Sequence, residues 1–112
     1  MPGKFEIKKA THGQFYFNLK SPNGEVILTS EMYKARTGAT KGIASVQANA
    51  GTAARFEKKV TKAGKPYFVL KAANHQVIGQ SESYSTEAAR DKGIAAVGKV
   101  AGAANIADLT KA

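Results

Sequence analysis

The hexapeptide KGIASV at residues 41–46 returns 51 positions later as KGIAAV at residues 92–97. The agreement extends without a gap in both directions: KFEIKK aligns with RFEKKV, GQFYFNLK with GKPYFVLK, and SEMY with SESY. So long a match indicates a tandem duplication, and an internal repeat constrains the fold before any other pattern. Two copies are too few for a solenoid or a propeller. We therefore expect them to complete one core around a pseudo-two-fold axis, as a fused two-fold dimer would.

The length of 112 residues suits a single domain (residues 1–112), made of repeat 1 (residues 4–54) and repeat 2 (residues 55–110). The chain has no cysteine, which excludes disulfides, a thiolate nucleophile and a Cys-ligated zinc site. No apolar run approaches the roughly 20 residues that span a bilayer, and the first ten residues lack the apolar core of a signal peptide. We expect a cytoplasmic monomer without a membrane partner.

Each repeat begins with the alternation that is typical of β-strands. Phe15, Phe17 and Leu19 point to one side and alternate with polar or amphipathic residues, and Phe5 and Ile7 do the same. This pattern predicts that Phe17 and its counterpart in repeat 2, Phe68, are buried.

The segment SPNG at residues 21–24 predicts a hairpin turn between two strands. Pro22 presets φ for a turn, and Gly24 suits a position with positive φ. His75 replaces Gly24 in repeat 2, and histidine tolerates that geometry better than most residues. Val26 and Leu28 continue as a third strand.

A helical period follows in each repeat. The apolar positions recur on one helix face, and in repeat 1 they are Ala39, Ile43, Val46 and Ala50. Ile94 takes the place of Ile43 in repeat 2, so we expect both isoleucines to be buried. Ser85 suits the N-cap of the second helix, whereas Lys34 in the same place predicts a later start, near Thr37. Left-handed caps are expected at the glycines that follow the helices, Gly51 and Gly102.

Gly42 and Gly93 lie inside the predicted helices, where glycine costs about 1 kcal/mol relative to alanine. We interpret both as places of close approach between the helix and the sheet or its twin helix. A bound ligand is the alternative. The tail at residues 105–110 predicts a final strand, and Pro66, which lacks an N–H, should begin its strand or lie at an edge.

The fold class is therefore α+β. Two tandem βββα repeats form one largely antiparallel sheet with two helices on one face, and a C-terminal strand completes it.

The duplicated GQFYFNLK, NGEVILTSEMY and KGIASV blocks resemble the YegP-like family of small bacterial proteins over nearly the whole chain. The resemblance implies this same fold, and it implies that one-repeat relatives assemble as dimers. It brings no activity, cofactor or catalytic residue, because the family is one of unknown function. The chain departs from the family pattern at Lys34, where a small polar residue is usual, and at Pro66.

The net charge of +9 favours an anionic partner such as nucleic acid or an acidic protein, and solubility alone is the alternative reading. On the sheet face opposite the core we expect aromatic residues interleaved with lysines, a pattern that resembles a stacking platform for single-stranded nucleic acid. Glu6 and Glu57 share that face and would repel phosphates. The candidate binding residues are Lys8, Tyr16, Lys20, Lys59, Tyr67 and Lys71.

A second candidate is the repeated S-E-x-Y cluster, which comprises Ser30, Glu31, Tyr33, Ser81, Glu82 and Tyr84. A carboxylate beside hydroxyls suits a polar pocket or a general base. The structural alternative is that these residues satisfy loose backbone N–H groups between strand and helix, with half-buried tyrosines. His12 and His75 are expected in a loop and a turn.

We expect no catalytic residue, metal or cofactor. The leading hypothesis is a small non-catalytic binding module for an anionic partner. A structural or protein-interaction module is the alternative, single-stranded nucleic-acid binding on the open sheet face is a more specific one, and an enzyme at the S-E-x-Y sites is the least favoured.

Overall fold

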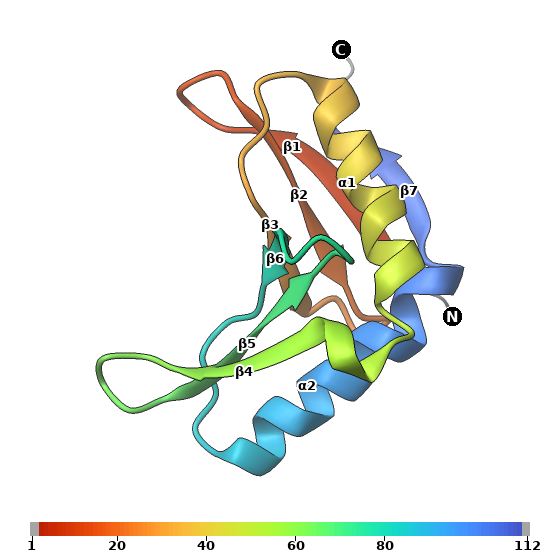
Figure 1. Cartoon of the computed structure of the whole chain (residues 1–112). Helices are drawn as coiled ribbons and strands as arrows, with labels where there is room; N and C mark the ends of the chain where they lie inside the picture. Colours follow the sequence, from red (N-terminus) through yellow and green to blue (C-terminus); the bar gives the residue numbers. More distant parts are fainter. Residues whose placement is uncertain (1–2, 111–112) are drawn as a thin grey trace.

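A computed structural model describes residues 3–110 as one sheet covered by two helices (Figure 1). The strands of repeat 1 are β1 (Lys4–Lys9), β2 (Phe15–Lys20) and β3 (Val26–Ser30), and its helix is α1 (Arg36–Asn49). Repeat 2 has β4 (Phe56–Val60), β5 (Pro66–Lys71), β6 (Val77–Gln80), α2 (Glu87–Val100) and the final strand β7 (Asn105–Asp108). Short 3-10 turns precede β4 (η1, Ala53–Arg55) and follow α2 (η2, Ala101–Ala103). The predicted order of elements is thus confirmed.

The seven strands lie in the order β4-β5-β6-β3-β2-β1-β7. All neighbours are antiparallel except β1 and β7, which are parallel. The two repeats meet where Thr29 of β3 lies opposite Gln80 of β6. These residues occupy the same position of the two repeats, so the pseudo-two-fold axis passes between them.

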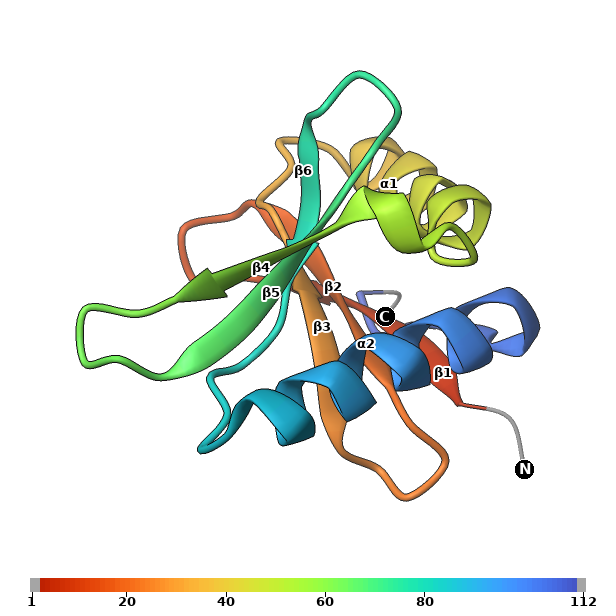
Figure 2. The ribbon, with the colours of Figure 1, turned by 60° about the horizontal axis from the view of Figure 1, so that its bottom comes forward.

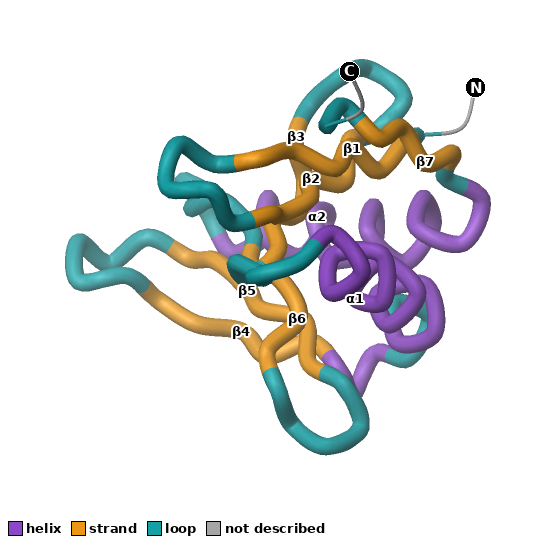
Figure 3. Tube along the Cα trace, turned by 90° about the horizontal axis from the view of Figure 1, so that it is seen from above, coloured by secondary structure: helices purple, strands orange, loops and turns teal. Residues whose placement is uncertain are grey.

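Both helices cover the same face of the sheet, and the strands curve around them (Figures 2 and 3). The loops between β1 and β2 and between β4 and β5 project from the side of the molecule that lies away from α1 (Figures 1 and 2). Neither helix lies on the other face of the sheet, and we refer to it as the open face. No helix in the described part of the chain is long and apolar enough to cross a membrane.

The core between the helices and the sheet follows the predicted strand phase. Phe17 and Phe68 are fully buried, as is Ile43. The prediction for Ile94 is wrong, because this residue is only partly buried. Its counterpart Ile43 lies in the half of the molecule where β7 extends the sheet and where α1 packs against η2.

The turns agree with the sequence-based predictions. Gly24 has a φ of 88°, and His75 in the equivalent place has a φ of 71°. The Gly24 N–H donates to the Ser21 carbonyl oxygen at 2.9 Å, which closes the turn. Pro66 begins β5, where its missing N–H is tolerated.

The helix ends differ from the predictions in three details. The α1 helix begins at Arg36, close to the predicted start near Thr37, but α2 begins at the same repeat position, so the expectation that α1 starts later than α2 is wrong. The N-cap of α2 is Thr86 rather than Ser85, because the Thr86 side chain accepts a hydrogen bond from the Ala89 N–H at 3.1 Å.

The expected left-handed caps are also absent. Neither Gly51 nor Gly102 is among the residues with positive φ. The α2 helix continues directly into η2, and Ala50, the C-cap residue of α1, has right-handed backbone angles, so neither helix ends at a left-handed residue.

The glycines inside the helices face the tyrosines of the S-E-x-Y motifs. A Cβ atom at Gly42 would lie 2.5 Å from the Tyr33 hydroxyl and 2.9 Å from the Phe17 ring. At Gly93 it would lie 2.3 Å from the Tyr84 hydroxyl. Close approach of helix and sheet therefore accounts for both glycines.

Candidate functional site

The six candidate binding residues all lie on the open face, in two clusters related by the pseudo-two-fold axis. Strand pairing places Lys8 opposite Tyr16 in repeat 1 and Lys59 opposite Tyr67 in repeat 2. The repeat-1 cluster is Lys8, Tyr16 and Lys20, and the repeat-2 cluster is Lys59, Tyr67 and Lys71. Strands β3 and β6 separate the clusters, so β2 and β5 lie three strand spacings, or about 14 Å, apart.

In repeat 1 the lysines gather around one carboxylate. Glu6 lies between Lys20 (3.0 Å), Lys4 (3.4 Å) and Lys8 (3.6 Å), measured from carboxylate oxygen to ammonium nitrogen. Only 8% of the Glu6 side chain is exposed, whereas the ammonium-bearing side chains are 25–52% exposed. The hydrogen bond from Lys20 holds the pKa of Glu6 below its usual range, against the opposing effect of burial. The carboxylate therefore stays ionised and fixes three cations at the surface.

Repeat 2 has a looser version of the same arrangement. Glu57 pairs with Lys71, whose ammonium lies in contact with it, and with Lys59 at 3.8 Å. The Glu57 side chain is 44% exposed. The hydrogen bond from Lys71 lowers the pKa of Glu57. Arg55, which replaces Lys4, makes no ion pair with Glu57, and its Nε atom is buried without a hydrogen-bond partner among residues 3–110.

Between the two clusters, the open face carries a polar residue in repeat 1 and an apolar residue in repeat 2. Asn18, which is 6% exposed, donates from Nδ2 to the Thr29 Oγ1 at 2.9 Å. Val69 takes the position of Asn18 in repeat 2 and is 3% exposed. These two positions therefore offer few free polar groups to a ligand, and binding on the open face must use the lysines and tyrosines of the two clusters.

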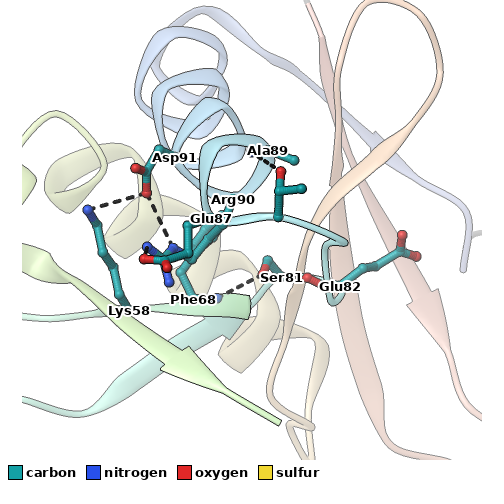
Figure 4. A network of polar contacts seen from close by, with 9 residues as sticks. Lys58, Phe68, Ser81, Glu82, Glu87, Ala89, Arg90 and Asp91 are labelled. Carbon is teal, nitrogen blue, oxygen red and sulfur yellow. Dashed lines mark hydrogen bonds and ion pairs between the residues drawn. The ribbon is translucent and has the colours of Figure 1, made fainter. Parts of the chain in front are cut away.

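The serines of the S-E-x-Y motifs complete the strands. The Ser30 hydroxyl accepts a hydrogen bond from the Phe17 N–H at 2.9 Å and donates to the Glu31 carbonyl oxygen at 2.8 Å. Ser81 makes the same two hydrogen bonds with Phe68 and Glu82 (Figure 4). These contacts agree with the structural interpretation of the motif, although the N–H groups that are satisfied belong to strands and not to helix ends.

The glutamates of the two motifs lie on either side of the axis, each two residues beyond the Thr29–Gln80 pair. Glu31 and Glu82 line a cavity of about 260 Å³ together with Thr29, Ser30, Gln80 and Ser81. Both carboxylates are exposed. An anion would be repelled from this central cavity, so the lysine clusters are the better anion-binding positions.

The tyrosines of the S-E-x-Y motifs point away from the glutamates and pack beneath the helices. Tyr33 stacks on Phe17, and Tyr84 stacks on Phe68, at centroid distances of 6.4 and 6.3 Å. Burial and, to a smaller extent, the neighbouring glutamates raise the pKa of both hydroxyls. Each motif therefore places its glutamate at the surface and its tyrosine ring beneath a helix.

Two features were missed by the sequence reasoning. Lys4 belongs to the ring of cations around Glu6, and its alternation with Glu6 and Lys8 was the available signal. A cavity of about 610 Å³ lies where α1 faces the 72–78 segment of the other repeat, and its lining includes Tyr33 and Lys41. No local pattern predicts a cavity formed by segments so far apart in the chain.

The histidines have local roles. His75 lies in the turn described above, and the His12 Nδ1 atom accepts a hydrogen bond from the Gln14 N–H at 3.3 Å in the loop after β1. Within residues 3–110, no group of three or more His, Asp or Glu side chains is placed to hold a metal ion.

Comparison with known proteins gives one consistent match. The family described as a domain of unknown function (DUF1508) matches residues 10–57 and 61–108, which are again 51 positions apart. The chain is 56% identical to the UPF0339 protein ACIAD0721 of Acinetobacter baylyi, over 98% of this chain and 99% of the relative. It is 55% identical to the UPF0339 protein YegP of Escherichia coli, over 87% of this chain and 88% of the relative.

Two solved structures resemble this one. The solution structure of the UPF0339 protein SO3888 from Shewanella oneidensis has a TM-score of 0.91 at 53% identity, and the match covers 97% of this chain and 92% of that one. The solution structure of the E. coli protein of unknown function yegP has a TM-score of 0.94 at 49% identity, covering 100% and 97%. These similarities agree with the predicted fold and family resemblance, and they name no ligand or reaction.

Proposed function

This chain belongs to the DUF1508 family and is similar to the YegP proteins. We propose that it is a non-catalytic module that binds an anionic partner. The partner lies on the open face and contacts the repeat-1 and repeat-2 clusters. The observation that carries the proposal is the ring of three lysines around the buried Glu6.

The lysine ring supports anion binding because the cations are already ordered. Three ammonium groups around one carboxylate leave a net charge of two positive units, and the carboxylate lies beneath them. Lysines normally lose side-chain entropy on binding, and prior ordering reduces that cost. In repeat 2, two lysines share Glu57, so the positive field is weaker there.

The lowered pKa values of Glu6 and Glu57 support a role for these two carboxylates in positioning cations rather than in acid–base catalysis. A general base works best when its pKa lies near the working pH. The lysines hold the pKa of Glu6 and Glu57 below the ordinary range, so both are weak bases that serve to position cations. The proposal includes a cytoplasmic setting, where nucleic acids and acidic proteins are abundant.

Single-stranded nucleic acid is the more specific candidate. Tyr16 and Tyr67 are half-buried and each lies directly across from a lysine, so a base on the ring leaves its phosphate near a cation.

The test is fluorescence anisotropy with two labelled polyanions, a single-stranded oligonucleotide and polyglutamate, at about 50 and 200 mM salt. We expect binding of at least one of the two probes to fall steeply as salt rises, because each released counterion steepens the dependence. The double variant Lys8→Gln/Lys20→Gln should weaken it about tenfold or more. The matched control Lys92→Gln/Lys99→Gln removes the same charge from the exposed side of α2 and should change it much less.

The tyrosines distinguish the two anion classes. Tyr16→Ala with Tyr67→Ala keeps the charge and should weaken oligonucleotide binding by about tenfold, while polyglutamate binding stays unchanged. An absence of binding to either polyanion at low salt would exclude the proposed function.

A further inference from the structure

The two ends of the sheet are not equivalent. At one end β7 covers the outer edge of β1 in parallel register, with Phe5 opposite Ile106 and Ile7 opposite Asp108. At the other end β4 is the last strand, although it is the repeat-2 counterpart of β1. No strand in residues 3–110 occupies the outer edge of β4.

The apolar side chains near β4 are less buried than their counterparts near β1. Phe5 is 0% exposed and Ile43 is 1% exposed, whereas their counterparts Phe56 and Ile94 are only partly buried. A cavity of about 330 Å³ opens between β4 and α2 at this edge. Its lining consists of Ala53, Phe56, Lys58, Asp91, Ile94 and Ala95.

We propose that the edge of β4 and this cavity form a strand-accepting site for an extended segment of a partner protein. The segment lies parallel to β4, as β7 lies parallel to β1, and its main chain bonds to the free edge. The pseudo-two-fold relation sets the register, in which an apolar residue lies opposite Phe56 and points toward the cavity. The next residue lies opposite Glu57, on the open face, where a small side chain such as that of Ala107 fits.

The ion pair at the mouth of the cavity is weak enough to move aside. Lys58 takes the place of the buried Ile7, and its ammonium lies 3.3 Å from the Asp91 carboxylate (Figure 4). Both side chains are about half exposed, and such pairs contribute little to stability. Arg90 bridges Asp91 and Glu87 nearby, so the mouth carries two charges of each sign. The site therefore selects by main-chain hydrogen bonds and apolar contact more than by charge.

A separate segment fits this edge better than a second copy of the chain. The β4 region carries Arg55, Lys58 and Lys59 against the single acid Glu57. Two such edges placed side by side would repel each other, and edge lysines are a common protection against self-pairing.

The test uses the full chain and a synthetic peptide with the sequence of residues 103–110, AANIADLT, as a model of a strand. The amide resonances of the isotope-labelled protein are followed by NMR as the peptide is added. We expect shifts at the amides of β4 (Phe56–Val60) and around Ile94. Shifts confined to β1 and β7, which would mean displacement of the chain's own strand, would overturn the proposal. So would a total lack of shifts, or a protein that is already a dimer through β4.

Two variants and the salt dependence sharpen the test. Ala95→Glu narrows the cavity from an exposed position and should weaken binding about tenfold, whereas its counterpart Ala44→Glu on α1 should leave it unchanged. A peptide with Ile106→Ser should also bind about tenfold more weakly. Binding should change less than about twofold between 50 and 200 mM salt, which separates this site from the anion site on the open face. If Ala95→Glu and Ala44→Glu weaken binding equally, the cavity is not the site.

Discussion

Repeat 1 and repeat 2 share their interior almost without change and differ at the edges. The Phe5–Phe17 and Phe56–Phe68 ring pairs are both edge-to-face, with centroid distances of 5.8 and 5.7 Å. The stacked pairs with Tyr33 and Tyr84 have interplanar angles of 9° and 10°. Each repeat thus has the same arrangement of three aromatic rings, whereas the outer edge of β1 pairs with β7 and the outer edge of β4 has no neighbouring strand among residues 3–110.

The difference shows what a fused duplication permits. In a dimer of identical chains every residue appears twice, including the residues at the axis. Here Leu28 is fully buried, and its counterpart is Gly79, where a Cβ atom would lie 2.9 Å from the Leu28 side chain. One leucine therefore fills a space at the axis that two leucines would overfill.

The largest expected effect compares the covered and the open edge. Phe5→Ala should lower the free energy of unfolding by about 3–5 kcal/mol, because it leaves a cavity under a fully buried ring. Phe56→Ala should cost only about 1–2 kcal/mol, because that ring is already partly exposed. Urea unfolding measures both.

Phe17→Ala and Phe68→Ala provide the control for this comparison. Both rings are 0% exposed, so both variants should cost about 3–5 kcal/mol. Equal costs for Phe5→Ala and Phe56→Ala would show that the two edges do not differ in packing.

The second prediction concerns the axis. Gly79→Ala should destabilise the protein by about 1–3 kcal/mol, because the new methyl group meets the Leu28 side chain and the Thr29 carbonyl oxygen. The swap Leu28→Gly/Gly79→Leu moves the leucine to the other side of the axis and should be more stable than Leu28→Gly alone. A swap that is no better than Leu28→Gly would mean that the two sides of the axis are not interchangeable.

The repeat explains why much of the fold follows from the sequence. Alternation in repeat 1 gave the strand phase, and the repeat carried it to repeat 2. The turn predicted at Gly24 has its counterpart at His75, which also has a positive φ. Burial of Ile94 was the exception: it is only partly buried, whereas its counterpart Ile43 is 1% exposed and lies in the half of the molecule where β7 extends the sheet. Periodicity reports which face of a helix is apolar, and it does not report whether a neighbour covers that face.

The candidate site was predicted less completely. Strand alternation placed the six candidate residues on one face, but the convergence of three lysines on Glu6 depends on how long side chains bend. The cavity that Glu31 and Glu82 both line depends on the pairing of β3 with β6, which joins the two repeats. Strand order was the missing information, since neither local propensity nor alternation specifies which strands become neighbours.

The third prediction tests a feature that the repeats share. Gly42→Ala should destabilise the protein by about 0–2 kcal/mol, because overpacking against Tyr33 and Phe17 exceeds the gain of about 1 kcal/mol in helix propensity. Gly93→Ala should behave alike. The double variant Gly42→Ala/Tyr33→Phe removes the clashing hydroxyl and should recover part of the loss in thermal unfolding. Higher melting temperatures for both alanine variants would contradict the close contact.

The smallest effect compares the two carboxylates on the open face. Lys20→Gln should cost about 0.5–1 kcal/mol, because it removes the shortest ion pair of the buried Glu6. Lys71→Gln should cost less, because Glu57 is half exposed and water replaces the lost partner. Urea unfolding at neutral pH compares the two variants.

The pH dependence of stability is a second way to compare Glu6 with Glu57. The pKa of Glu6 is lowered in the folded state relative to its usual value of 4.5, so the ionised form stabilises the fold at neutral pH. That contribution is present above pH 4.5 and is lost as the pH falls through the lowered folded-state value. The stability difference between the wild type and Glu6→Gln should therefore shrink between neutral and acidic pH. Urea unfolding of Glu57→Gln over the same range should show a smaller change, and an equal change would mean that burial of Glu6 beneath its three lysines adds nothing.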